Sequence, residues 1–394
     1  MPVLTKGSRL QTCKLQAETW THTHVGSGKA ISRWEYFFDQ DRLVLLDYAK
    51  LADEALRTPD LIDKMVQEAD APAGSLHACL RTRDQLTRRR LAAAYRQLPE
   101  YLAKLNEEER QIRSLRMFAG SPKCYLPGSS IKGALRTAYM SDRVVRSKDK
   151  DAIFARDSGD DTTNFKNFQF NINRPFRDLR SLDNELFQNI IVRDTAAFKD
   201  RDTGIASVSI YARLTQGSKA RTRQDSGDED EYCEIILCQS KFEIEIVLKT
   251  EKLRGKPIKS AADLLETADR FYRRVWDFER TNQGELKRRK SDVSEFYMDE
   301  GTKPSNDFYL LRVGYGCGQP GTSLLMDYKE HFTPQHGGAA DSPLRHPSIY
   351  RRNPQLRTRT PYPYTARAAA AGDVAERQPL GWIVINKDMV IEND

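Results

Sequence analysis

The chain has 394 residues, and its 63 basic and 56 acidic side chains leave a net charge of +7. Hydrophobic residues make up 39% of it, enough to build the core of two domains or of one large one. No apolar run approaches the roughly 20 residues that span a bilayer, and residues 1–15 lack the pattern of a signal peptide. The six cysteines are scattered without a CxxC pair, which argues against a disulfide framework and a zinc site. We therefore expect a cytoplasmic protein with no metal and no cofactor.

The first 50 residues predict the opening strands of a sheet. Residues 10–19 alternate in the manner of a half-buried strand. Residues 34–38 and 43–46 are strand-like and flank the turn Asp39-Gln40-Asp41, which is the signal of a hairpin. A helix is expected to begin near Tyr48.

Residues 51–118 are predicted to form a helical insertion, because apolar residues recur there at spacings of three and four. One stripe lies within residues 51–65. The other comprises Leu86, Leu91, Tyr95, Leu98, Leu102 and Leu105. Six arginines between Arg81 and Arg96 accompany the second stripe, and they form either an ordinary solvated face or an RNA contact.

Residues 119–199 combine a loop, a helix, an exposed segment and a short strand. Residues 122–128 form the loop, after which Ser129 or Ser130 is expected to cap a helix that runs to about Val145. Residues 147–164 are charged and poor in apolar side chains, which is typical of an exposed loop. The short strand follows near Ile190.

The rest of the chain divides into a finger and a second structured half. Residues 200–232 end in a tract too hydrophilic to fold alone, so we expect a protruding, thumb-like finger. Residues 233–394 begin with one long strand over 235–248, followed by a helix capped by Ser260. Further strands are expected at residues 310–313 and 382–385.

Helices alternate with strands along the chain, while the hairpins favour antiparallel pairing. This pattern predicts an α+β fold with helices packed on one face of a sheet. Two β-α-β halves of this type form an RRM-like or ferredoxin-like core. Its first half is expected in residues 1–50 and 119–199, and its second half in residues 233–394.

The first candidate site is the helix start at residues 127–136. Glycine before a helix allows another backbone to come close, and the helix start offers unpaired N–H groups and a positive dipole end, which suit a phosphate. Lys132 and Arg136 are four residues apart, so both lie on one face and reach the same anion. The alternative is a capped core helix with two solvated cations.

The second candidate is the glycine-rich segment that begins at Arg312 and runs to Ser323. Its glycines match GxGxxG, but Pro320 lies inside the motif and no suitable β-α-β unit follows, so we reject a dinucleotide site. A nest of backbone amides for phosphates or sugars fits better. The alternative is a tight connection between two elements.

The third candidate is the segment His22–Gly28. Two histidines two residues apart on a strand face the same side and suit a metal, but no third ligand is near in sequence. A histidine could also act as a general base in RNA cleavage. Stacking on RNA, hydrogen bonding to RNA or simple packing is favoured over both.

The fourth candidate is the arm over residues 342–372, which has no acidic residue and interleaves arginines with tyrosines and prolines. Cations and stacking aromatics on a loose tether suit single-stranded RNA. The alternative is a loop that docks on a neighbouring protein.

Several of these segments resemble one protein family. Residues 126–136 resemble the signature PGSSLKGALR, residues 23–28 resemble the start VHIGSG, and residues 314–318 resemble a C-terminal glycine-rich loop, all of the CRISPR RAMP superfamily. Residues 192–195 resemble the short strand that follows the signature. Residues 379–382 resemble the PLGW ending of one branch, the fifth Csm subunits of type III-A effectors.

The resemblance implies an RRM-like core whose thumb would map to the finger. It implies a non-catalytic subunit that binds crRNA and target RNA, caps the filament at the 3′ end of the crRNA, and contributes to crRNA maturation in antiviral defence. Its partners would be other Csm subunits, both backbone RAMP and small subunits, and neither a membrane nor a small-molecule substrate. The residues that would contact RNA are His24, Gly26, Ser27, Gly28, Ser129, Ser130, Lys132, Arg136, Arg312, Gly314, Gly316 and Gly318.

Two other functions stay open on the sequence. One is an endoribonuclease of the same superfamily that processes crRNA, and the other is a protein scaffold. The related backbone subunit cuts target RNA with an aspartate, but Asp39 and Asp41 are better explained as turn residues. We therefore expect no enzyme activity in the isolated chain.

Overall fold

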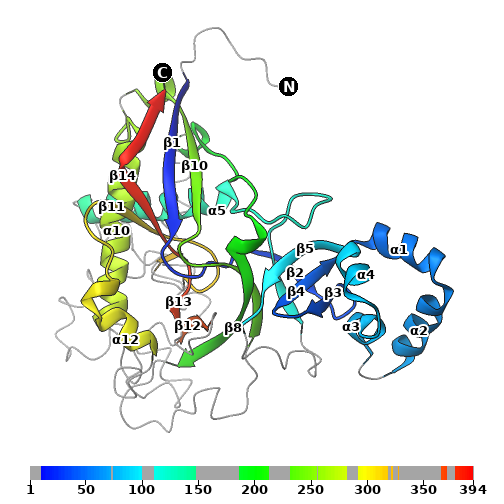
Figure 1. Ribbon diagram of the computed structural model, residues 1–394. Helices are drawn as coiled ribbons and strands as arrows, with labels where there is room; N and C mark the ends of the chain where they lie inside the picture. Colours follow the sequence, from blue (N-terminus) through cyan, green and yellow to red (C-terminus); the bar gives the residue numbers. More distant parts are fainter. Residues whose placement is uncertain are drawn as a thin grey trace, which may run out of the picture.

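The chain folds into two β-sheets with helices at either end, as seen in a computed structural model (Figure 1). The structure describes residues 10–71, 74–99, 111–147, 186–212, 231–254, 256–281, 292–317, 321, 322, 327, 365–370 and 378–393. None of the helices in this part of the chain is long and apolar enough to cross a membrane. The architecture is mixed α+β.

The first sheet has five strands, and every neighbouring pair in it is antiparallel. In spatial order the strands are β11 (Phe308–Arg312), β14 (Trp382–Asn393), β1 (Leu10–Thr19), β10 (Lys241–Lys249) and β7 (Ile190–Val192). Along the chain, β7 follows the helix α5 (Gly128–Arg146), and β11 follows the helix α10 (Ala261–Thr281). The last strand, β14, then enters between β11 and β1.

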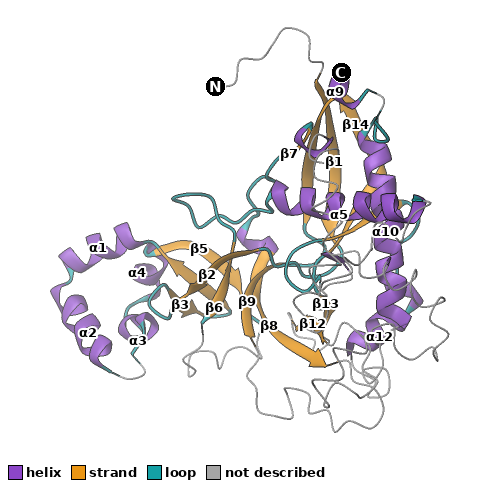
Figure 2. Ribbon diagram, turned by 180° about the vertical axis from the view of Figure 1, so that it is seen from behind, coloured by secondary structure: helices purple, strands orange, loops and turns teal. Residues whose placement is uncertain are grey.

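Two long helices, α5 (Gly128–Arg146) and α10 (Ala261–Thr281), cover one face of the first sheet (Figure 2). Alternate residues of β1 point at them, with Leu15 fully buried. Ser260 caps α10 as predicted, because its hydroxyl accepts the Asp263 N–H at 3.1 Å. Trp276 and Trp382 lie at the centre of this core with ring centroids 5.0 Å apart. The helix α9 (Thr250–Leu253) follows β10, α12 (Asp292–Met298) follows α10, and a short 3-10 turn spans Glu300–Thr302.

The second sheet has nine strands and lies beside the first (Figure 1). Its main order is β2 (Gly26–Ile31), β6 (Ile112–Leu115), β9 (Glu231–Ile236), β8 (Thr203–Ala212), β5 (Ala92–Gln97), β4 (Arg42–Leu46) and β3 (Tyr36–Asp39), while β12 (Thr365–Ala370) pairs with β8 and with β13 (Gln378–Pro379). The predicted hairpin is confirmed as β3 and β4, with Gln40 in the turn at φ 58°. Asp39 lies beside Arg88 and Arg89, which supports a structural role for this carboxylate.

Four helices form a helical group beyond the end of the second sheet (Figure 1). They are α1 (Tyr48–Arg57), α2 (Pro59–Asp70), α3 (Leu76–Leu80) and α4 (Gln85–Arg90). The predicted start near Tyr48 is confirmed, because the Asp47 carboxylate accepts the N–H groups of Ala49 and Lys50. This helical group packs onto Phe37 of β3 through Leu51, Leu61 and Leu80.

The second helical stripe was predicted wrongly. The helix ends at Arg90, and residues 92–97 form strand β5, whose alternate residues Ala92, Ala94 and Arg96 are buried. Leu102 and Leu105 lie outside the described residues. The predicted insertion is therefore helical only in its first part.

Residues 235–248 also differ from the prediction of a single strand. The chain leaves the second sheet after Ile236, turns through Gln239 at φ 62°, and enters the first sheet at Lys241. The segment expected as a finger begins with the 3-10 turn Asp200–Asp202 and with β8, which pairs with β9. Residues 213–230, where its tip was expected, lie outside the described residues.

Candidate functional site

The candidate site lies where the chain passes from the first sheet to the second. After β1, residues 20–25 cross between the sheets and pair with strands on both sides. Trp20 and Thr21 donate backbone hydrogen bonds to the Trp382 carbonyl, and Thr23 exchanges two with Ile236 at 2.9 and 2.8 Å. The two histidines were predicted to lie on a strand. The structure instead has an isolated β-bridge at Thr23, and hydrogen bonds to β9 and β14 hold the segment in place.

The two predicted glycine motifs, from opposite ends of the chain, meet at this crossing. The Tyr315 N–H donates to the His24 carbonyl at 2.7 Å. Gly314 has a φ of +82°, and a Cβ there would lie 2.3 Å from the same oxygen. Only glycine satisfies both the left-handed backbone and this close approach. The structure thus brings together His24 and Gly314.

A pocket of about 750 Å³ opens beside this contact. Among the residues that line it are His24, Gly26, Gly28, Lys29, Arg113, Ser114, Glu231, Gly314 and Tyr315. Four of these were predicted from the sequence: His24, Gly26, Gly28 and Gly314. Lys29, Arg113 and Glu231 were missed, because they come from three strands, β2, β6 and β9, that only the fold brings together.

One wall of the pocket combines an aromatic ring with a cation. The Arg113 guanidinium lies over the Tyr315 ring, 5.4 Å from its centroid, and forms an ion pair with Glu231 at 3.0 Å. The Tyr315 hydroxyl donates to the other oxygen of Glu231. Glu231 therefore holds both side chains in place. An ordered tyrosine ring beside a guanidinium is a surface on which a base can stack.

The His24 imidazole lies next to this wall and meets the Tyr315 ring edge-on, with 5.7 Å between the ring centroids. Its Nδ1 lies 2.6 Å from the Glu234 carbonyl oxygen. Burial lowers the pKa of His24, against the opposing effect of that hydrogen bond. A carbonyl only accepts, so the neutral ring carries its proton on Nδ1.

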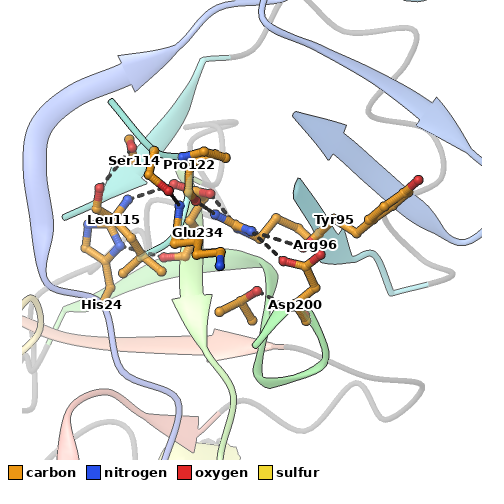
Figure 3. Close-up of polar contacts among 11 residues, drawn as sticks. His24, Tyr95, Arg96, Ser114, Leu115, Pro122, Asp200 and Glu234 are labelled. Carbon is orange, nitrogen blue, oxygen red and sulfur yellow. Dashed lines mark hydrogen bonds and ion pairs between the residues drawn. The ribbon is translucent and has the colours of Figure 1, made fainter. Parts of the chain in front are cut away.

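A buried ion pair lies beside this wall (Figure 3). Arg96 Nε donates to Glu234 Oε1 at 2.7 Å, and the other Glu234 oxygen accepts the Leu115 N–H at 2.8 Å. Arg96 also donates to the Pro122 carbonyl at 2.9 Å. Arg96 therefore belongs neither to a solvated face nor to an RNA contact, the two alternatives that the sequence left open.

The start of α5, the first candidate from the sequence, differs from the expectation. Neither serine caps the helix: Ser129 is exposed, Ser130 is half-buried, and both lie within its first turn. Instead the Asp194 carboxylate accepts the Gly128 N–H at 2.8 Å. A carboxylate of the chain itself thus occupies part of the helix end that was predicted to bind a phosphate.

The two cations on α5 nevertheless form a cluster. Lys132 and Arg136 are half-buried, and neither forms an ion pair within the described part of the chain. Burial lowers the pKa of Lys132, and repulsion from Arg136 and Lys249 lowers it further. Lys132 and Arg136 of α5 therefore form, with Lys249 of β10, a second cluster of positive charge and a candidate contact for an anion.

The other predicted residues serve the chain's own structure in this conformation. Arg312 is 4% exposed, and its guanidinium donates to Glu279 and to the carbonyls of Leu380 and Gly316. It is therefore not accessible to a phosphate, contrary to expectation. A Cβ on Gly316 would meet Leu380 at 2.9 Å, so this glycine serves packing.

The remaining predictions concern Ser27, Gly318, the basic arm over residues 342–372 and a metal site. The Ser27 hydroxyl accepts the Lys29 N–H at 3.1 Å and shapes the turn before the pocket lysine. Gly318 lies outside the described residues, as does the arm apart from residues 365–370, which form β12. Within the described ranges there is no group of three potential metal ligands. His22 and His24 contact separate backbone groups, Cys238 N–H and Glu234 C=O.

Comparison of the chain with known proteins identifies its family. Residues 16–307 match the sequence model of the RAMP superfamily. The chain belongs to the RAMP superfamily. No curated protein matches this chain significantly.

Two solved structures share the fold of this RAMP protein. One is Csm5 of T. onnurineus, with 17% identity and a TM-score of 0.60, covering 94% of this chain and all of that one. The other is a chain of a type III-A Csm–crRNA–target RNA ternary complex, with 16% identity and a TM-score of 0.59, covering 95% of this chain and all of that one. At this identity the likeness concerns the fold.

Proposed function

We propose that this RAMP protein is a non-catalytic RNA-binding subunit of a type III-A CRISPR effector. In this proposal it caps the filament at the 3′ end of the crRNA and contributes to crRNA maturation and target RNA binding in antiviral defence. Its partners are then crRNA, target RNA and the backbone and small Csm subunits. The pocket where His24 meets Gly314 carries the proposal, because it combines a stacking ring, two cations and close backbone approach.

The topology of the first sheet supports an RRM-like core. Without the edge strand β11, the spatial order is β14-β1-β10-β7, with α5 preceding β7 and α10 following β10 along the chain. This is the order of a split β-α-β arrangement with the last strand beside the first. The edge strand β11 and the whole second sheet are additions to that arrangement.

Two cationic surfaces support a path for a single strand. Lys29 and Arg113 line the pocket, and Lys132, Arg136 and Lys249 gather on the side of α5. Backbone contacts of this kind bind RNA with little dependence on sequence, as a guide subunit requires. The residues proposed to contact RNA are therefore His24, Gly26, Gly28, Lys29, Arg113, Ser129, Lys132, Arg136 and Gly314.

The test is salt-dependent binding of the purified full chain to a crRNA-length oligoribonucleotide. Each phosphate contact contributes about 0.7 to the slope of log affinity against log salt for a single strand. Lys29→Ala is expected to lower affinity and reduce the slope by about that amount. Arg57→Ala removes one positive charge from an exposed site in the last turn of α1, which lies beyond the end of the second sheet, and is expected to change neither (Figure 1).

The same experiment separates the other two functions. A protein scaffold would show no salt-dependent RNA binding. An endoribonuclease would cleave a crRNA repeat, with a loss of cleavage in His24→Ala. Either result with the purified chain would overturn the proposal.

A further inference from the structure

The hydrogen bond to Glu234 fixes which nitrogen of His24 carries the proton. The Glu234 carbonyl oxygen has no hydrogen to donate, so Nδ1, 2.6 Å away, must be the donor. The ring is 3% exposed, and its lowered pKa keeps it neutral at physiological pH. Nε2 is therefore left as a lone-pair acceptor.

Gly26 determines what can reach Nε2. A Cβ on Gly26 would lie 2.8 Å from that nitrogen, so any side chain at this position would cover or displace it. Gly26 is exposed, and both residues line the pocket. Among the residues that the structure describes, none forms a hydrogen bond with Nε2. The acceptor thus faces the pocket without a partner from the protein.

The other walls of the pocket suit one nucleotide. Lys29 and Arg113 supply positive charge for a phosphate, and the Tyr315 ring offers a stacking face. A pocket of about 750 Å³ is within the usual range for small-ligand sites. The Nε2 acceptor lies beside these groups, so a nucleotide held by them places its own donors within reach of it.

The chemistry of the backbone identifies that donor. Phosphate oxygens and the ring oxygen of the sugar only accept hydrogen bonds, whereas ribose hydroxyls donate as well. DNA has no internal hydroxyl. We propose that Nε2 of His24 accepts a hydrogen bond from a ribose 2′-hydroxyl and makes this pocket selective for RNA over DNA. The inference rests on the proposed function, because it assumes that the pocket holds a nucleotide.

The test compares three probes on the full chain by fluorescence anisotropy: an oligoribonucleotide, its all-2′-deoxy counterpart, and the oligoribonucleotide ending in a 3′-deoxy sugar. The wild type is expected to bind RNA on the order of tenfold more tightly than DNA, the effect of one good hydrogen bond. Weaker binding of the 3′-deoxy oligoribonucleotide would identify the terminal 3′-hydroxyl, which DNA also carries, as the donor and would overturn the inference. Equal binding of the 3′-deoxy and the unmodified oligoribonucleotide is expected, because the donor is a 2′-hydroxyl.

Two variants remove the acceptor in different ways. His24→Asn keeps an N–H for the Glu234 carbonyl but has no atom in the place of Nε2, and Gly26→Ala keeps the imidazole but covers or displaces Nε2. Each is expected to lower RNA affinity to the level of DNA without changing DNA affinity. Gly301→Ala is the matched control, because it adds the same methyl group to an exposed glycine that lies outside both the pocket and residues 127–136. Should His24→Asn not fold, Gly26→Ala carries the test alone.

The outcomes distinguish this inference from the proposed function. A wild type that binds RNA and DNA equally well refutes the role of His24 but leaves RNA binding in place. A wild type that binds neither refutes the proposed function itself. A loss in the variants that follows base sequence and not the sugar would mean that Nε2 contacts a base, which also overturns the inference.

Discussion

The Tyr315 N–H and the His24 carbonyl, 2.7 Å apart, join the loop after β11 to the crossing after β1. The same two residues face each other through their rings. Because one comes from the start of the chain and the other from its last quarter, the pocket between them exists only when both sheets are formed. We therefore expect RNA binding and global folding to be lost together in denaturant.

Gly314→Ala should break this junction. An alanine at φ +82° costs about 1–3 kcal/mol by backbone strain alone, and its Cβ would lie 2.3 Å from the His24 oxygen. We expect the free energy of unfolding to fall by at least that amount and RNA affinity to fall with it. Urea denaturation followed by tryptophan fluorescence measures the first and anisotropy the second.

Gly133→Ala serves as the control for that change. Gly133 is exposed within α5, and alanine is better than glycine in a helix by about 1 kcal/mol. The control should be as stable as the wild type or slightly more stable. Equal destabilisation of both variants would show that the Gly314 contact has no special importance.

Arg96→Met should be among the most destabilising single changes in the second sheet. Arg96 is 1% exposed and Glu234 is 0% exposed, so the change strands a buried carboxylate. Removing one partner of such a pair costs about 3–5 kcal/mol. Adding Glu234→Gln removes the stranded charge while keeping an acceptor for the Leu115 N–H, so part of the loss should return. A double variant no more stable than the single one would contradict this account.

Arg96 also explains why residues 92–97 were predicted as helix although they form strand β5. The buried face of this strand carries Ala92, Ala94 and Arg96, and a charged residue at an inward position hides the period of two. Its partner Glu234 comes from a distant strand, so no local pattern indicates that the charge is compensated. By contrast β1 buries only small or apolar side chains on alternate positions, and its bounds were predicted correctly.

The site was predictable only where its residues are special by type. Glycines and histidines in short motifs pointed to His24, Gly26, Gly28 and Gly314, which do line one pocket. Arg113 had no such signal, because the chain holds many arginines and only the pairing of β6 with β2 and β9 places this one. Similarly, the Gly128 N–H at the start of α5 donates to Asp194, which lies 66 residues further along the chain. The adjacent serines do not accept it, although serine is a common N-cap residue.

Acidification should destabilise the fold through His22. Burial lowers the pKa of His22 from its usual 6.5 to about 4, and its Nδ1 accepts the Cys238 N–H. Between these values the unfolded chain binds a proton that the folded chain does not, so stability is complete above pH 6.5 and falls as the pH drops towards 4. The contribution at pH 5 is a loss of about 2 kcal/mol relative to pH 7. Urea denaturation at both pH values measures it.

His22→Asn isolates this contribution from other titrating groups. Asparagine keeps an oxygen that can accept the Cys238 N–H but does not titrate in this range. The variant should lose about 2 kcal/mol less than the wild type between pH 7 and pH 5. His24, whose pKa is also lowered by burial, adds a loss of the same sign to both proteins. An identical pH dependence in the two would exclude His22 as the cause.

The double variant Lys132→Ala with Arg136→Ala tests the cationic surface of α5. Neither residue pairs with a carboxylate in the described part of the chain, so their loss should change stability by no more than about 0.5 kcal/mol. If both contact guide phosphates, the slope of log affinity against log salt should fall by about 1.4. Arg146→Ala removes a cation from the other end of the same helix, where it pairs with Asp142, and should leave the slope unchanged. An unaltered slope in the double variant would place the guide on the pocket alone, and a collapsed circular dichroism spectrum would show that these cations support the fold.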